Sequence, residues 1–226
     1  MQVAERQPHS LSPRGLAIAG WVALVLAIAT FITLAWQVQT LAPIVALDTR
    51  ISQWLHFNGI PGLTKALLVV TYVHSILGMS IISAAFGVVL WRIRELYWLL
   101  TLALAMVGGM LLNVLLKVTY ERARPVFEDP IVSHITFSFP SGHTAAATTF
   151  YGVLAAFLVS RAFSPRLRVA FVAAAMVMVA LVAFSRIYLG AHYLSDVVAA
   201  VCSSTVWLVA CLSGVHGMIR RRRSLR

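Results

Sequence analysis

The sequence has few charged residues, and acidic residues are the rarest among them. Charged residues make up 11% of the 226 residues, against about a quarter in a typical soluble domain. Only seven residues are Asp or Glu, whereas 60% of the chain is hydrophobic. This composition argues against an ordinary soluble enzyme and indicates an integral membrane protein.

Cysteine is also scarce. Cys202 and Cys211 are nine residues apart in one predicted helix. At about 100° per residue they point to opposite faces, so they cannot form a disulfide with each other. The sequence has no CxxC pair and no Cys/His cluster, which argues against a zinc site.

Long apolar runs, in contrast, are abundant. Six of them reach the roughly 20 residues needed to cross ~30 Å of hydrocarbon. They predict an all-α integral membrane protein with six transmembrane helices. The first run is too long for a signal-peptide core and is expected to remain as an anchor. We expect a cytoplasmic segment at 1–14, a six-helix domain at 15–218 and a basic cytoplasmic tail at 219–226. The predicted spans are 15–40, 66–91, 96–117, 142–163, 168–189 and 193–218.

The net charge of +11 would suggest a nucleic-acid partner in a soluble protein. Here the basic residues lie at the ends of apolar spans, which is how membrane proteins set their orientation, so no nucleic-acid partner is expected. With the N-terminus inside, twelve arginines fall in inner segments and six basic residues in outer ones. This distribution places both termini in the cytoplasm. The six outer residues are Arg50, Lys65, Lys117, Arg122, Arg124 and Arg186.

Three polar clusters are predicted to meet at the outer face. They are "KVTYERARPVFEDP" at 117–130, "SFPSGH" at 138–143 and "SRIYLGAHYLSD" at 185–196. Each lies at the outer end of a predicted span, although together they extend over about eighty residues of chain. We therefore expect one site built from all three.

The residue types in these clusters suit a phosphate. Lys117, Arg124 and Arg186 supply three positive charges, and the fork of an arginine matches phosphate oxygens in pairs. Ser141 and Gly142 lie where a helix begins, so their N–H groups and the helix dipole favour an anion. Gly142 has no Cβ to obstruct that anion.

Two histidines and one carboxylate add a reaction to this site. His192 and Asp196 are four residues apart on one helix face, so the carboxylate can orient the imidazole. That arrangement is typical of a histidine nucleophile, and His143 can then act as the general acid. Since lysine and arginine already provide positive charge, nothing in the pattern requires a metal or another cofactor.

The three motifs together resemble those of the type 2 phosphatidic acid phosphatase superfamily. They read Lys117-x6-Arg124-Pro125, then Pro140-Ser141-Gly142-His143, then Ser185-Arg186-x5-His192-x3-Asp196. The resemblance implies a metal-independent membrane lipid phosphatase whose site faces the periplasm or the outside. It implies that His192 forms a phosphohistidine, Asp196 orients it and His143 serves as acid and then base. The implied phosphate-binding residues are Lys117, Arg124, Ser141, Gly142 and Arg186.

The substrate implied by the resemblance is a lipid phosphate or diphosphate in the bilayer. Undecaprenyl diphosphate ranks first by similarity to small bacterial carrier-lipid phosphatases, followed by phosphatidylglycerophosphate and phosphatidic acid. Two enzymatic alternatives use the same residues, namely a lipid phosphotransferase and a lipid A phosphatase. A silent scaffold or a transporter is disfavoured because His143, His192 and Asp196 are all present.

Several further residues are interpreted structurally. The stretch 48–59 is expected to form a short interfacial helix, with Asp48 as N-cap, Gly59 as stop and Trp54 at headgroup depth. Glu121 and Arg122 are expected to form a solvated loop pair. His74 is expected to be a neutral histidine bonded to another helix. Gly108 and Gly109 are expected to permit close helix packing.

Overall fold

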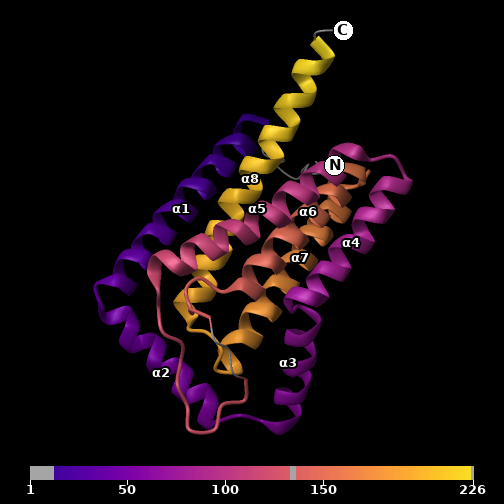
Figure 1. The fold of residues 1–226 in the computed structure, drawn as a ribbon. Helices are drawn as coiled ribbons and strands as arrows, with labels where there is room; N and C mark the ends of the chain where they lie inside the picture. The colour runs from indigo at the N-terminus through magenta and orange to yellow at the C-terminus, as the bar shows by residue number, and fades with distance from the viewer. Residues whose placement is uncertain (1–12, 133–135, 225–226) are drawn as a thin grey trace, which may run out of the picture.

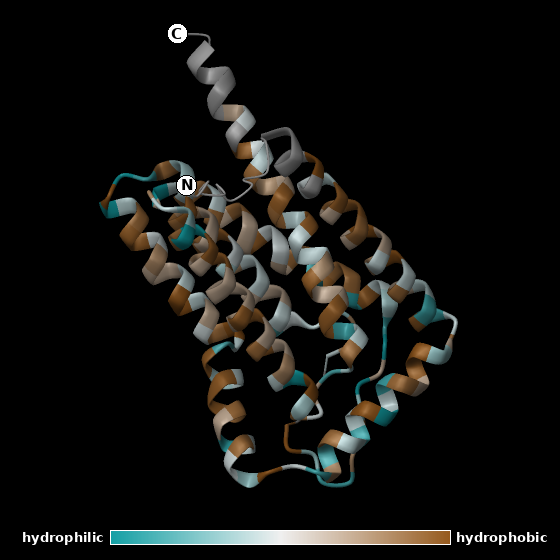
Figure 2. Cartoon of the chain, turned by 180° about the vertical axis from the view of Figure 1, so that it is seen from behind, coloured by the Kyte–Doolittle hydropathy of each residue, from teal (hydrophilic) through white to brown (hydrophobic). Residues whose placement is uncertain are grey.

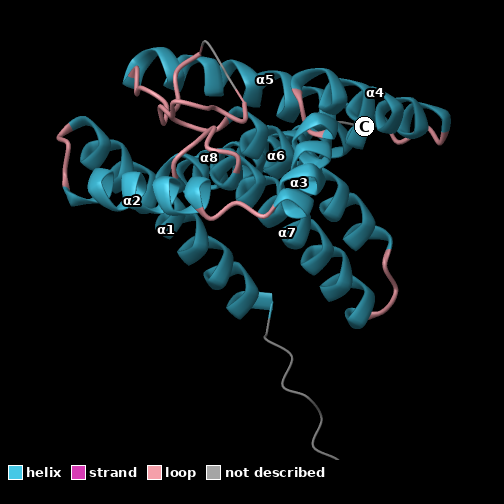
Figure 3. Ribbon diagram, turned by 90° about the horizontal axis from the view of Figure 1, so that it is seen from below, coloured by secondary structure: helices cyan, strands magenta, loops and turns pink. Residues whose placement is uncertain are grey.

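The computed structural model describes residues 13–132 and 136–224, and every regular element in these residues is a helix (Figures 1 and 3). This confirms the predicted all-α membrane fold. The helices are α1 (Pro13–Gln39), α2 (Pro43–Phe57), α3 (Pro61–Val73), α4 (Ile76–Arg92), α5 (Leu96–Tyr120), α6 (Gly142–Arg161), α7 (Pro165–Tyr188) and α8 (Leu194–Ser224).

Five helices are each long and apolar enough to cross a membrane, and the pair α3 and α4 supplies a sixth crossing if it is counted as one bent span. The predicted span 66–91 is therefore not one straight helix. Its two halves meet at 55°, because Ser75 starts a new helix by accepting a hydrogen bond from the Gly78 N–H at 3.2 Å. The apolar sequence is continuous across this break, so it does not predict where α3 ends and α4 begins.

The core forms around α6, which packs against α4, α5, α7 and α8. Small residues allow the close approach of α5 and α8. A Cβ at Gly108 would lie 2.2 Å from the Trp207 ring, and the Trp207 indole N–H donates to the Ala105 carbonyl at 3.1 Å. The close packing predicted for this glycine is confirmed.

The outer surface of the bundle is apolar over much of its length. Large side chains such as Trp21, Trp36 and Met176 are exposed, and hydrophobic residues dominate the helices in Figure 2. Water would disfavour such a surface, whereas lipid tails would not.

The helix ends divide the molecule into two poles. α1 begins and α8 ends at one pole, while α2 and the described parts of the loop before α6, residues 121–132 and 136–141, lie at the other (Figure 1). The three motifs are attached to this second pole. Which pole faces the cytoplasm stays a prediction, as does the assignment of 1–14 and 219–226 to cytoplasmic segments.

α2 corrects one prediction about the first outer segment. The helix begins at Pro43 after Ala42, so Asp48 lies within it and is not the N-cap. The Asp48 side chain is 0% exposed, which a capping carboxylate at a solvated helix start would not be. The helix ends at Phe57, just before the predicted stop at Gly59. Trp54 is 65% exposed, and its depth in a membrane stays a prediction.

Candidate active site

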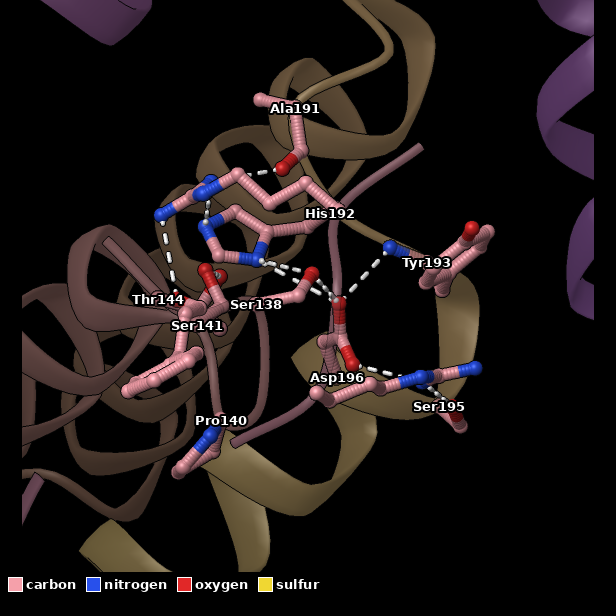
Figure 4. Close-up of polar contacts among 12 residues, drawn as sticks. Ser138, Pro140, Ser141, Thr144, Ala191, His192, Tyr193, Ser195 and Asp196 are labelled. Atoms are coloured by element: carbon pink, nitrogen blue, oxygen red, sulfur yellow. Dashed lines mark hydrogen bonds and ion pairs between the residues drawn. The ribbon is translucent and has the colours of Figure 1, made fainter. Parts of the chain in front are cut away.

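His192 and Asp196 form a buried pair between α7 and α8 (Figure 4). After α7 the chain turns through Gly190, whose φ of +68° is a conformation that favours glycine. The His192 N–H then donates to the Arg186 carbonyl at 3.1 Å. This turn places the His192 Nδ1 atom 3.3 Å from the Asp196 Oδ2 atom, with both side chains at most 1% exposed.

The partners of His192 determine its tautomer. An Arg124 Nη1 atom lies 3.1 Å from His192 Nε2. Because a guanidinium only donates, Nε2 must accept and Nδ1 must carry the proton. The Nδ1–H therefore faces Asp196, and the lone pair of Nε2 points toward Arg124.

His192 is neutral in this environment. Burial lowers the pKa of His192 to about 3. Its hydrogen bond and attraction to Asp196 act in the opposite direction but do not offset burial, and the charges of Arg124 and Arg186 lower the pKa further. A neutral imidazole with its lone pair on Nε2, the atom that accepts from Arg124, is the form that a nucleophile requires.

Three cations line the same cavity as His192, and we call Lys117, Arg124 and Arg186 the pocket cations. Lys117 donates to the Phe137 carbonyl at 2.5 Å, and Arg124 donates to the Thr136 carbonyl at 2.6 Å and the Ala191 carbonyl at 2.7 Å. Arg186 is buried and donates to the Thr71 hydroxyl. The loop before α6 thus holds the first two, and α3 holds the third.

The start of α6 forms another wall of the site. The Ser141 N–H donates to the Asp196 carbonyl at 3.1 Å, and the Thr144 hydroxyl donates to Ser141 Oγ at 3.0 Å. The Ser141 N–H is therefore directed to the α8 backbone and not to an anion, contrary to the expectation for this group. Gly142 and His143, at the first two helical positions, border the cavity instead.

A cavity of about 860 Å³ connects these groups with the bundle exterior. At one end it is polar and at the other it is apolar, between α4 and α5. The polar end contains six of the eight predicted site residues, and within the described residues no three His, Cys, Asp or Glu side chains come together as a metal site. The polar-end residues are Lys117, Arg124, Gly142, His143, Arg186 and His192.

Behind His192, the Asp196 carboxylate is fully occupied. Its Oδ2 atom accepts from the Ser138 hydroxyl at 2.5 Å and the Tyr193 N–H at 2.9 Å, in addition to His192. Its Oδ1 atom accepts from Arg122 Nη1 at 2.6 Å. Such bonds stabilise the ionised form of a buried carboxylate.

The prediction that Arg122 forms a solvated pair with Glu121 is wrong. Arg122 is 9% exposed and bridges two carboxylates. Its Nη2 atom lies 2.8 Å from Asp48 Oδ2, and its guanidinium lies 4.2 Å from the centre of the Tyr193 ring. Burial would lower the pKa of Arg122, but Asp196 and Asp48 together raise it.

His74, at the break between α3 and α4, is bonded to another helix as predicted. Its Nδ1 atom lies 2.8 Å from the Val70 carbonyl, and its Nε2 atom lies 2.8 Å from the Tyr151 hydroxyl of α6. A carbonyl only accepts, so Nδ1 carries a proton and Nε2 is free to accept from Tyr151.

Comparison with known proteins places this site in a family. The model of the PAP2 superfamily matches residues 98–220, more than half of the chain. The chain belongs to the PAP2 superfamily. All three motifs of this PAP2 protein fall within the matched region, and the chain is accordingly a multi-span membrane lipid phosphatase.

Two relatives resemble most of the PAP2 chain. Phosphatidylglycerophosphatase B of Bacillus subtilis is 32% identical over 169 residues, which cover 74% of this chain and 82% of the relative. The crystal structure of a transmembrane PAP2-type phosphatidylglycerolphosphate phosphatase from Bacillus subtilis superposes with a TM-score of 0.76 at 29% identity. It covers 88% of this chain and 96% of that one.

Two further matches are more partial. Lipid A 1-phosphatase of Rhizobium etli is 40% identical over 101 residues, which cover 41% of this chain and 39% of that protein. The structure of Aquifex aeolicus LpxE has a TM-score of 0.59 at 23% identity, covers 74% of this chain and 95% of that chain, and shares the fold.

Proposed function

We propose that this PAP2 protein hydrolyses the phosphate of a membrane lipid through a phosphohistidine on His192. One observation carries the proposal, namely a neutral His192 whose Nε2 atom contacts Arg124 in a cavity that Lys117 and Arg186 also line and that continues between two membrane helices. A phosphate held by the pocket cations lies beside the nucleophile, while the lipid chain extends along the apolar end.

The reaction then has two steps. His192 Nε2 attacks phosphorus, the ester P–O bond breaks, and His143 gives its proton to the leaving alcohol oxygen. In the second step His143 takes a proton from water, the oxygen attacks phosphorus, and the P–N bond breaks to release inorganic phosphate. Asp196 stabilises the positive charge that the imidazole gains on phosphorylation, and the pocket cations stabilise the charge on the phosphoryl oxygens.

The apolar end of the cavity supports a lipid substrate. It lies between α4 and α5, with lining side chains that include Met79, Met110, Leu111 and Val114. A chain leaving the site here enters the bilayer directly. The name of the Bacillus subtilis relative moves phosphatidylglycerophosphate to first place, ahead of undecaprenyl diphosphate and phosphatidic acid. We place the site at the outer face of a bacterial inner membrane, with both termini cytoplasmic.

Phosphate release from a lipid panel tests the proposal. The detergent-purified protein, with EDTA present, is given phosphatidylglycerophosphate, undecaprenyl diphosphate, phosphatidic acid and lipid A. We expect release from phosphatidylglycerophosphate and a loss of at least about 10⁴-fold in His192→Ala. Comparable release by His192→Ala would exclude this nucleophile, and a requirement for added Mg²⁺ would exclude a metal-independent reaction.

A second experiment tests the intermediate. His143→Ala lacks the acid of the first step and the base of the second, so the label is supplied as ³²P-labelled p-nitrophenyl phosphate, whose leaving group needs no acid. We expect protein-bound phosphate to accumulate in this variant and to be absent from the His143→Ala, His192→Ala double variant. Phosphohistidine is stable to base and labile to acid. Label with the opposite stability would contradict the assignment, and label transferred to an added alcohol would show a phosphotransferase.

A further inference from the structure

A buried charge network lies behind His192, and Asp196 is its one member with a role in the reaction steps above. We call Asp48, Arg122, Ser195 and Asp196 the rear network. Arg122 Nη1 lies 2.6 Å from Asp196 Oδ1 and 2.7 Å from Ser195 Oγ, and its Nη2 atom lies 2.8 Å from Asp48 Oδ2. The Ser195 N–H and hydroxyl also donate to Asp48.

The network joins three distant parts of the chain. Asp48 belongs to α2, Arg122 to the loop after α5, and Asp196 to the first turn of α8. Asp48 and Asp196 are each 0% exposed. Burying one charge without a partner costs several kcal/mol, so buried charges usually have hydrogen bonds and a counter-charge that compensate for lost hydration. In the rear network, the guanidinium group of Arg122 pairs with both carboxylates.

We propose that Arg122, held in place by Asp48, is a positioning residue that balances the charge of Asp196 so that His192 stays neutral and ready to attack. Asp196 then orients the Nδ1–H of His192 without drawing a second proton onto the ring. This inference rests on the proposed function of His192 as nucleophile and goes beyond it, because it assigns a role to α2 and to a residue between the motif positions Lys117 and Arg124.

The charged groups around His192 determine the sign of the effect. Asp196 faces it from α8, Arg124 from the loop and Arg186 from α7. Without Arg122, Asp196 keeps its charge but loses the nearest counter-charge. His192 then becomes its closest partner, which favours the imidazolium form. Removal of Arg122 therefore raises the pKa of His192, and protonation removes the nucleophile at a higher pH.

Kinetics of four variants test this role in the full-length protein. In Arg122→Met we expect kcat to fall about 10²-fold with little change in KM. The acid limb of kcat/KM should move up by at least about one pH unit. Arg122→Lys keeps the charge, so the limb should return close to its wild-type position. Asp48→Asn removes the residue that holds Arg122 in place, so kcat should fall about tenfold. Because this change also removes a negative charge, the acid limb of kcat/KM should not move up. Arg50→Gln, on the exposed side of the same helix as Asp48, is the matched control and should behave as wild type.

A titration that needs no turnover separates this inference from the proposed function. With ¹⁵N-labelled histidine, the His192 ring signals are identified by their absence in His192→Asn. We expect them to stay constant from about pH 8 to about pH 5 in wild type and, in Arg122→Met, to begin to change at a pH at least about one unit higher than in wild type. If the signals behave so but His192→Ala still releases phosphate, the proposed reaction fails and the charge role stands.

Unchanged titration and an unchanged acid limb in Arg122→Met, with only a lower melting temperature, would show a scaffold and overturn the inference. If Arg122→Met does not fold, Arg122→Gln and Asp48→Asn in the same titration decide the matter. Arg122→Gln should shift the signals upward, and Asp48→Asn should not.

Discussion

The two sides of His192 contain similar charged groups in opposite arrangements. On the pocket side three cations gather, and among the described residues that line the cavity none is Asp or Glu. On the other side the rear network surrounds one arginine with two carboxylates and a serine. The imidazole separates the two regions, with Nε2 toward the first and Nδ1 toward the second.

The difference shows how binding residues and positioning residues can be told apart in a buried site. The positive charges of the pocket side complement an anionic substrate, whereas the charges of the rear network are neutralised by one another. Substitutions on the pocket side should therefore change how the enzyme handles phosphate. Substitutions behind His192 should change the state and the orientation of the imidazole.

Arg124→Lys should break the pocket side most severely among charge-conserving changes. Lysine keeps the charge but loses the fork that can bind two phosphoryl oxygens, so kcat/KM should fall by about 10²-fold. Inhibition by vanadate should weaken as well. Steady-state kinetics beside Arg50→Lys check this, and a value within about threefold of wild type would remove Arg124 from phosphate binding.

Ser138→Ala should have a smaller effect on the side behind His192. The Ser138 hydroxyl donates to Asp196 Oδ2 at 2.5 Å, but the Tyr193 N–H and Arg122 remain as partners of that carboxylate. We expect kcat to fall about tenfold with KM unchanged. Ser160→Ala, an exposed serine of α6, is the control. A rise in KM with constant kcat would indicate that Ser138 contacts substrate instead.

Val114→Trp should sharpen the contrast between the polar and apolar ends of the cavity. Val114 lines the cavity on α5, so a larger ring narrows the path proposed for the lipid chain. The ratio of lipid to p-nitrophenyl phosphate turnover should fall about tenfold. Val118→Trp, also exposed on α5 but absent from the lining, should leave the ratio unchanged. Equal ratios in both variants would place the lipid elsewhere.

Acidification should destabilise the protein through His192. Its pKa is about 3 in the fold, below the ordinary 6.5, so between these values the unfolded chain binds more protons and stability rises with pH. From pH 6.5 to pH 4.5 this group alone costs about 2 kcal/mol. Melting curves in detergent should show a shallower acid dependence in His192→Asn. A parallel dependence in both proteins would contradict the burial of a neutral ring.

Much of the site could be predicted from sequence because each motif lies at the end of an apolar run. Lys117, Arg124, His143, Arg186 and His192 do line one cavity. Helices such as α5 and α7 could be predicted equally well, since each is a continuous apolar segment. Local pattern and membrane geometry are sufficient for such features.

The rear network could not be predicted in the same way. Asp48 and Arg122 are 74 residues apart and meet only through the packing of α2 against the α5–α6 loop. Each has a reasonable local interpretation, as a helix cap and as a solvated charge. The break at Ser75 was missed for a related reason, because the apolar pattern continues across it while the cap bond depends on a single hydroxyl. One available signal was the density of charge in "YERARP", where a second arginine precedes the motif arginine.

The hydrogen bond from the Ser141 N–H to the Asp196 carbonyl has a mechanical consequence. It fastens the start of α6, which carries His143, to the first turn of α8, which directly follows the turn that holds His192. The wall of α3 and α4 is instead bent by 55° at His74. A change in bilayer thickness tilts membrane helices. Such a tilt should therefore alter the bent wall of α3 and α4 more than the joined ends of α6 and α8.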